Sequence, residues 1–217
     1  MTNFIPIFPL AIVVFPGEVL NLHIFEPRYK QLITEHATTG KAFGIPTVLN
    51  NKMEELGTLV EVTEIVKKYD NGELDISTKG LDVFRILETI NEVPDKLYSG
   101  AIVNYPRNEN NGNAELMKKV VEAIRQLHKM LNVSKPFPKN DDQLTSYDVA
   151  HHAGLSLDEE YELLGLMKEI QRQEYLRRHL QKVIPVVAQM ESLKEKVKLN
   201  GHFRNLSGFE FDFGSEK

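Results

Sequence analysis

The sequence predicts an α+β protein in which a small antiparallel β-barrel with one inserted helix is followed by an all-α helical subdomain. The first half of the 217 residues consists of short apolar runs that Pro and Gly interrupt. A polar segment without periodicity, residues 106–113, ends this pattern, and apolar side chains then recur at helical spacing. We therefore divide the chain into a barrel subdomain (1–105), a linker (106–113), a helical subdomain (114–199) and a C-terminal tail (200–217).

The first barrel elements follow from local patterns. Residues 4–9 contain two prolines and are expected to be extended at an edge or a bulge of the sheet. Apolar and polar residues alternate over 20–24, which is typical of a half-buried strand. Pro27 is suited to the first position of a helix, and Gly40 to the position just after its end. One short helix is thus expected among the strands.

A β-hairpin is the clearest local signal. Residues 58–69 are rich in Val, Ile and Thr, and alternation resumes over 74–79. Between them, Asn71 and Gly72 supply the two positive-φ residues that a type I′ turn needs.

The remaining strands complete the barrel. Gly80 is expected to break the second hairpin strand. Two further strands are predicted at 83–87 and 101–103. About six short strands and one helix suggest a closed or partly closed antiparallel barrel.

The second half carries helix signals. Asn113 is a candidate N-cap for a helix with apolar residues at 3.6-residue spacing, and a short helix near 146–153 follows. Ser156 and Glu159 form a capping box that opens the next helix. The apolar pattern continues past Pro185, which is expected to kink or break it.

Composition excludes several classes of protein. The chain has 26 Lys and Arg against 31 Asp and Glu, a net charge of −5, which argues against bulk electrostatic binding of nucleic acid or anionic lipid. Cysteine is absent, which excludes disulfides, thiol nucleophiles and cysteine metal sites. No apolar stretch approaches the roughly 20 residues of a membrane helix, and no cationic leader precedes the first apolar residues. We expect a soluble, cytoplasmic protein.

The motifs of common enzymes are missing. The sequence contains no P-loop, no Gly-x-Gly-x-x-Gly, no Gly-x-Ser-x-Gly and no His-Glu-x-x-His. His151 and His152 are adjacent, so on a helix they point about 100° apart, and we interpret them as ordinary, partly exposed histidines. No catalytic, cofactor-binding or metal-binding residue is predicted.

A basic cluster on the last helix is a candidate anion-binding track. Acidic residues at helical spacing are interleaved with it, so a solvated face with intrahelical ion pairs is the better interpretation. The cluster consists of Arg172, Arg177, Arg178 and Lys182.

The N-terminal stretch carries a family resemblance. Phe8-Pro9-Leu10 is followed over residues 14–29 by VFPGEVLNLHIFEPRY, a string similar to the N-terminal substrate-binding domain of Lon proteases. The resemblance extends over roughly residues 4–190. It departs at Asn21, where the family commonly has Pro, and at Val83, where it often has Arg.

The resemblance implies a PUA-like barrel and a capacity to bind polypeptide. A complete Lon protease also has an ATPase module and a Ser-Lys protease module, which we do not expect in a chain that ends at Lys217. The leading hypothesis is therefore a non-catalytic Lon-type protein that binds unfolded or flexible polypeptides or acts as a protease adaptor, without cofactors. The alternative is a PUA-like module that binds a small molecule or RNA.

Three residues of this stretch are the candidate polypeptide-binding residues: Phe25, Arg28 and Tyr29, since aromatic and Arg side chains dominate binding energy. A structural role remains open for each. We expect an elongated apolar cleft where this segment meets the helices after Leu155. Residues 209–213 alternate Phe with acidic residues and could form a strand on their own chain or on a partner.

Overall fold

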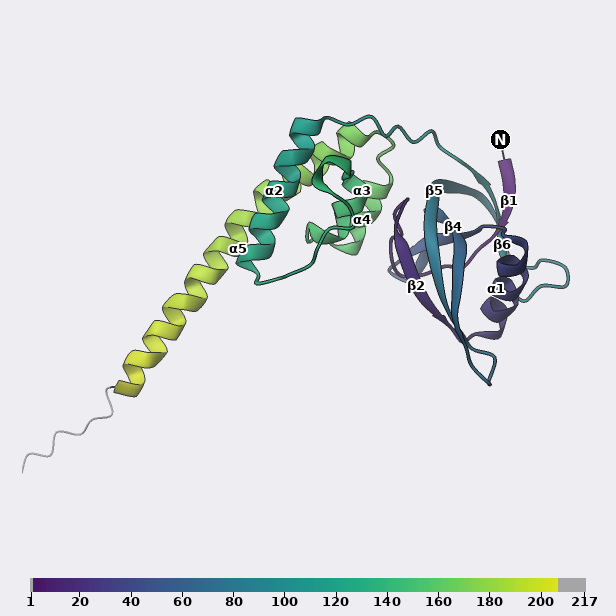
Figure 1. Ribbon diagram of the computed structural model, residues 1–217, viewed down its shortest axis with the longest axis horizontal. Helices are drawn as coiled ribbons and strands as arrows, with labels where there is room; N and C mark the ends of the chain where they lie inside the picture. Colours follow the sequence, from purple (N-terminus) through teal and green to yellow (C-terminus); the bar gives the residue numbers. More distant parts are fainter. Residues whose placement is uncertain (1, 207–217) are drawn as a thin grey trace, which may run out of the picture.

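The computed structural model describes residues 2–206, as six strands and a set of helices (Figure 1). The strands are β1 (Thr2–Pro6), β2 (Val19–Ile24), β3 (Phe43–Leu49), β4 (Lys52–Lys68), β5 (Leu74–Ile90) and β6 (Gly100–Asn104). The helices are α1 (Pro27–Thr39), α2 (Ala114–Met130), α3 (Ser146–Val149), α4 (Leu157–Leu164) and α5 (Glu169–Leu206), with 3-10 turns η1 (Asp141–Gln143) and η2 (Ala150–His152). The predicted strand over 209–213 lies outside the described residues.

The predicted α+β architecture is confirmed. The strands pair antiparallel in the order β1-β6-β5-β4-β3, and β2 pairs with the first part of β5. The chain just after β1 then runs parallel to β3, where Phe8 N–H donates to Gly44 O at 2.8 Å and Val48 N–H to Leu10 O at 2.8 Å. These bonds join the two ends of the sheet, so a short parallel segment closes an otherwise antiparallel barrel.

Gly80 does not break its strand, as the sequence had suggested. β5 and its partner β4 each run for 17 residues, so they are long strands and residues 83–87 continue β5. A Cβ on Gly80 would lie 2.3 Å from the carbonyl oxygen of Phe15, while Gly80 N–H donates to Glu18 O at 2.8 Å. Glycine is needed here because another segment of backbone crosses the strand closely.

The turn of the predicted hairpin differs in type from the prediction. Gly72 has φ 78°, but Asn71 is not among the positive-φ residues, and Gly72 N–H donates to Tyr69 O at 2.9 Å. The β4–β5 loop is thus a type I turn followed by a left-handed Gly, and the predicted type I′ turn is wrong there. The two consecutive positive φ values occur instead at Asn50 (49°) and Asn51 (63°), between β3 and β4.

The predicted helix ends are mostly confirmed. Pro27 opens α1, and Gly40 follows it with a left-handed φ of 65°. Asn113 Oδ1 accepts from the N–H of Leu116 at 3.0 Å at the start of α2, and the capping box of α4 is formed. α5, however, continues through Pro185 without a break.

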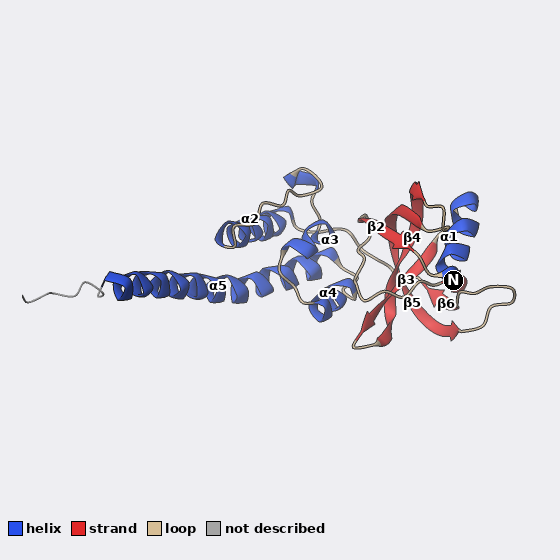
Figure 2. Cartoon of the chain, turned by 90° about the horizontal axis from the view of Figure 1, so that it is seen from below, coloured by secondary structure: helices blue, strands red, loops and turns tan. Residues whose placement is uncertain are grey.

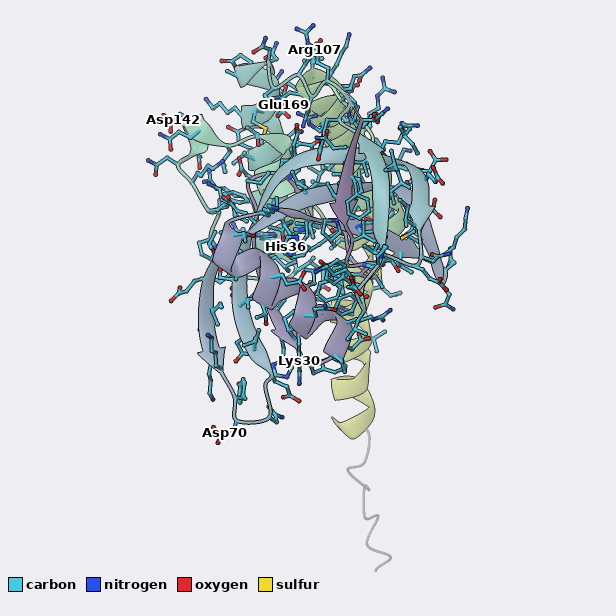
Figure 3. All side chains as sticks on the ribbon, turned by 90° about the vertical axis from the view of Figure 1, so that its right-hand side faces the viewer. Lys30, His36, Asp70, Arg107, Asp142 and Glu169 are labelled. Carbon is cyan, nitrogen blue, oxygen red and sulfur yellow. The ribbon has the colours of Figure 1, made fainter. Side chains whose placement is uncertain are left out.

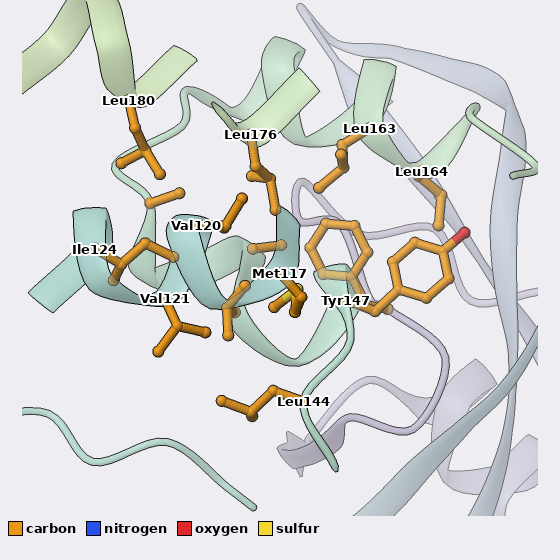
Figure 4. Close-up of a cluster of buried hydrophobic side chains, with 14 of the residues drawn as sticks. Met117, Val120, Val121, Ile124, Leu144, Tyr147, Leu163, Leu164, Leu176 and Leu180 are labelled. Carbon is orange, nitrogen blue, oxygen red and sulfur yellow. The ribbon is translucent and has the colours of Figure 1, made fainter. Parts of the chain in front are cut away.

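The hydrophobic core runs through the junction between barrel and helices. Its largest cluster combines Val13, Phe15, Leu56 and Val83 of the barrel part with buried residues of α2, α3, α4 and α5 (Figure 4). A second cluster fills the barrel beneath α1. In Figures 1 and 2, α1 lies on the side of the barrel away from α2–α5, and α5 projects outward. None of the helices described has an apolar run that could cross a membrane.

Candidate functional site

The three predicted binding residues lie at α1, in different environments. Phe25 is 60% exposed, whereas Tyr29 is 4% exposed and its ring stacks on Phe8 with centroids 3.7 Å apart. Arg28 pairs with Glu26 (Nη2–Oε2, 2.7 Å) and its guanidinium lies 4.5 Å from the Tyr29 ring centroid. Phe25 and Arg28 therefore face solvent, while Tyr29 belongs to the barrel core.

The predicted cleft between this segment and the helices after Leu155 is wrong. Tyr29 packs in the cluster under α1, and the helices contact the barrel through the other cluster, which includes Phe15 and Val83. The inward face of α1 is apolar and packs against the core of the barrel. The junction itself is packed: Phe15 stacks on Tyr147 with centroids 5.4 Å apart.

His151 forms ion pairs with both sides of this junction. Its Nδ1 lies 2.7 Å from Glu160 Oε1 of α4, and its Nε2 lies 3.2 Å from Glu18 Oε2 of the barrel. Burial lowers its pKa, but the hydrogen bonds and charges of Glu160 and Glu18 outweigh this and raise the pKa to about 9. His151 is therefore an imidazolium at neutral pH.

His152 differs from its neighbour. Its side chain is buried, and burial together with Lys135 lowers its pKa to about 4, so it is neutral. The prediction of two partly exposed histidines is therefore wrong for His152. Across the described residues, no group of three or more His, Asp or Glu side chains is placed to hold a metal ion.

The prediction of a solvated basic face is wrong for Arg172. Its side chain is fully buried and pairs with Glu169 (Nη2–Oε2, 2.9 Å). It also donates to Asn108 Oδ1 at 2.8 Å and to Leu166 O at 2.7 Å. Arg172 thus fastens the linker to the first turn of α5.

The neighbouring arginines do behave as the helical spacing predicted. Arg177 and Arg178 both pair with Glu174, each with an Nε–Oε distance of 2.7 Å. These pairs hold the pKa of Glu174 low, at about 2. Two of the four basic residues are therefore paired on the helix surface, and because they share one carboxylate the group keeps one net positive charge.

Three hollows follow the linker from the barrel to α5. The first, the loop hollow, has about 630 Å³ and lies where the β5 segment at Gly80 faces the linker. The second, the α2–η1 groove, has about 610 Å³ and shares Asn110 with the first. The third, the α2–α5 groove, has about 800 Å³ and shares Asn113 and Glu115 with the second. The loop hollow and the α2–η1 groove meet at Asn110 and form a track beside the linker, whereas the α2–α5 groove lies on the opposite flank of α2 and meets this track only at the start of the helix.

Figure 3 shows at which end of the molecule this track lies. Arg107 of the loop hollow, and Asp142 and Glu169 of the α2–η1 groove, lie toward one end of the view. Lys30 of α1 and Asp70 of the β4–β5 turn lie toward the other. The track is therefore separate from the segment that the sequence had suggested.

The linker is held tightly where it borders the α2–η1 groove. Asn113 N–H donates to Gln173 Oε1 at 2.9 Å. A Cβ on Gly112 would lie 2.3 Å from Gln173 Nε2, so glycine allows the linker to pass this close to α5. Met117, Val121 and Leu144 supply apolar surface to the groove. The sequence had marked only Asn113 among these residues, as a helix cap, because the walls come from separate segments.

Comparison with known proteins gives one family and one fold. The model of the family "ATP-dependent protease La (LON) substrate-binding domain" matches residues 5–182. A Lon N-terminal domain protein from Xanthomonas campestris is 24% identical, with a TM-score of 0.62 over 80% of this chain and 96% of that one. The N-terminal domain of Mycobacterium avium complex Lon protease is 14% identical, with a TM-score of 0.58 over 82% and 98%. The matched residues contain β2–β6, the linker and both walls of the α2–η1 groove.

Proposed function

This chain belongs to the family of the substrate-binding domain of ATP-dependent protease La (Lon), and from that membership we propose that it binds flexible polypeptide segments. The family match is the observation that carries the proposal, because it covers the barrel, the linker and most of the helical part. In this proposal the chain performs no chemical step. It holds a client or docks on a protease as an adaptor.

We place the client along this track, over the loop hollow and the α2–η1 groove beside the linker. An extended chain needs a long surface with apolar depressions and polar edges, since such a surface tolerates varied sequences. The track has both: apolar floor residues in the α2–η1 groove, and exposed charged residues on its rims. Phe25 and Arg28 remain proposed contacts on the other side of the barrel. The ring of Tyr29 packs against the guanidinium of Arg28 there.

The alternative, an RNA-binding module, has weaker support. Binding to phosphates needs a cluster of free cations, but Arg172 is buried and Arg177 and Arg178 share Glu174, which leaves one net positive charge and the exposed Lys182 on that face. The net charge of −5 also disfavours binding to nucleic acid. The ratio of absorbance at 260 and 280 nm of the purified protein, and a salt-dependent gel-shift assay, test this alternative directly.

The proposal is tested by fluorescence anisotropy with a permanently unfolded client, carboxymethylated α-lactalbumin. Ala114→Trp fills the mouth of the α2–η1 groove from an exposed position and is expected to weaken binding several-fold. Ala188→Trp, at an exposed position of α5 that lines none of the three hollows, is the matched control. Absence of client binding by the unmodified protein would overturn the proposal, as would ATP hydrolysis or casein cleavage that a point mutation in this chain abolishes.

A further inference from the structure

We propose that the α2–η1 groove selects cationic amphipathic segments, in which a Lys or Arg of the client is flanked by apolar side chains. This inference rests on the proposed function and specifies the chemistry of the segment that is bound. It is carried by the floor of the groove, by the charges on its two rims and by the ion pair that closes one end.

The floor of the groove is apolar. Met117 and Val121 come from α2, and Leu144 comes from the segment just after η1. Each is at most 6% exposed and belongs to the large core cluster, so the floor is rigid. A hollow of about 610 Å³ over such a floor is large enough for one or two side chains of a bound peptide.

The α2 rim carries two carboxylates. Glu115, Lys118 and Glu122 follow one another at spacings of three and four, so they lie on one face of the helix, and all three are exposed. No ion pair joins Glu115 or Glu122 to another described side chain. The rim of α2 therefore presents two carboxylates around one ammonium group.

The opposite rim adds a third carboxylate. Asp141 forms a bidentate pair with Arg125 of α2, at 2.7 Å and 2.6 Å, which bridges the groove and neutralises both groups. Asp142 is exposed and has no such partner among the described side chains. The two rims thus carry three carboxylates without an ion-pair partner, Glu115 and Glu122 on α2 and Asp142 opposite, against a single unpaired cation, Lys118.

The N-terminus of α2 does not reverse this charge. Helix N-termini attract anions through unpaired N–H groups. Here Asn113 Oδ1 accepts from Leu116 N–H at 3.0 Å, and the Asn113 carbonyl accepts from Met117 N–H at 2.9 Å. The groove therefore keeps its acidic character.

A Lys or Arg side chain matches both parts of the groove. Its methylene stem can cover the apolar floor while its charged head reaches the carboxylates of the rims. Exposed ion pairs are each weak and are screened by salt, so the preference is expected to be several-fold and to shrink as ionic strength rises. An acidic segment would meet like charges on both rims, which disfavours its binding.

The test uses three fluorescein-labelled peptides with the same apolar residues and with Lys, Gln or Glu at two fixed positions. Anisotropy titrations of the full chain are expected to give about threefold to tenfold tighter binding of the Lys peptide than of the Gln peptide, and the weakest binding for the Glu peptide. Raising NaCl from about 50 mM to about 500 mM should reduce this preference, because the Debye length falls.

Variants locate the effect in the groove. The triple variant Glu115→Gln, Glu122→Gln, Asp142→Asn should abolish the Lys preference, so that the Lys and Gln peptides bind with equal affinity. The matched control Glu64→Gln, Glu88→Gln, Glu92→Gln removes three exposed carboxylates of the barrel part and should keep the preference.

The outcomes separate this inference from the proposed function. Equal binding of the three peptides, or a preference that survives the triple variant, would overturn the inference alone. Failure of all three peptides and of the unfolded client to bind would overturn the proposed function as well. A concentration-dependent dimer that the triple variant dissociates would assign the groove to a second copy of the chain and would also overturn the inference.

Discussion

The guanidinium of Arg172 holds three segments of the chain at once. It pairs with Glu169 and donates to Asn108 Oδ1 and Leu166 O in a fully buried position. Truncation to Ala leaves the Glu169 carboxylate buried without its cation, and such a change costs about 3–5 kcal/mol. We expect Arg172→Ala to lower the free energy of unfolding by this amount in urea titrations.

Arg178 is the matched control for that substitution. It pairs with Glu174 on the same helix, but its side chain is 69% exposed. Exposed pairs contribute less than about 1 kcal/mol, so Arg178→Ala should have a small effect. Equal losses for the two variants would contradict the role assigned to Arg172.

His151 makes stability depend on pH. Its pKa is about 9 in the folded chain against an ordinary value of 6.5, because Glu160 and Glu18 outweigh the effect of burial. A raised pKa contributes stability that is complete below pH 6.5 and is lost as pH rises through 9. With solvent screening taken into account, we expect a decline of about 1–2 kcal/mol across this window, measured by urea unfolding.

The variant His151→Gln tests the source of this decline. Gln retains a hydrogen-bonding side chain but cannot titrate, so the difference in stability between the two proteins should be largest at and below pH 6.5 and fall to its smallest value above pH 9. A difference that is constant with pH would show that the ring acts only through packing on Phe15, whose centroid is 4.9 Å away.

At the scale of the elements, the tight turn between β3 and β4 depends on two asparagines. Asn50 and Asn51 have φ values of 49° and 63°, a region that costs other L-residues about 1–2 kcal/mol. Asn51→Ala is therefore expected to lose about 1 kcal/mol of stability, and Asn51→Gly to be neutral or stabilising, in thermal unfolding. Asp70→Ala, in the other hairpin at a residue without positive φ, should change little; an equal loss there would contradict the explanation.

The same turns show what local sequence can predict. Period-two alternation and helix caps identified β2, α1, α2 and α4, because these signals arise from neighbouring residues. The geometry of each turn and the continuity of β5 were not predictable in this way. Gly80 stays in its strand because Phe15, 65 positions earlier, crosses it, and no local pattern reports such a contact.

At the scale of the whole molecule, the candidate site follows from how distant segments meet. The α2–η1 groove exists because α2, η1 and the linker converge, and Arg172 and Gln173 of α5 hold the linker there. Each segment alone resembles an ordinary solvated element. The family resemblance of residues 8–29 therefore identified the family but pointed to residues on the other side of the barrel from the groove.

The shared core also determines how the chain unfolds. Phe15 of the barrel part is fully buried and packs on Tyr147 of α3, and Val83 of β5 belongs to the same cluster. An apolar junction of this kind couples the two parts, in contrast to the polar interfaces of loosely associated domains. We expect strand and helix peptides to lose hydrogen-exchange protection at the same denaturant concentration.

Phe15→Ala should shift this common midpoint downward. Removal of a buried Phe costs about 3–5 kcal/mol, and here the lost contacts lie between the two parts, so both should be destabilised together. Hydrogen exchange followed by mass spectrometry reports peptides of β4 and β5 separately from those of α2 and α4. If the helices of the unmodified chain lost protection while the strands kept theirs, the junction would not couple the two parts, and the division at the linker would mark two independent folding units.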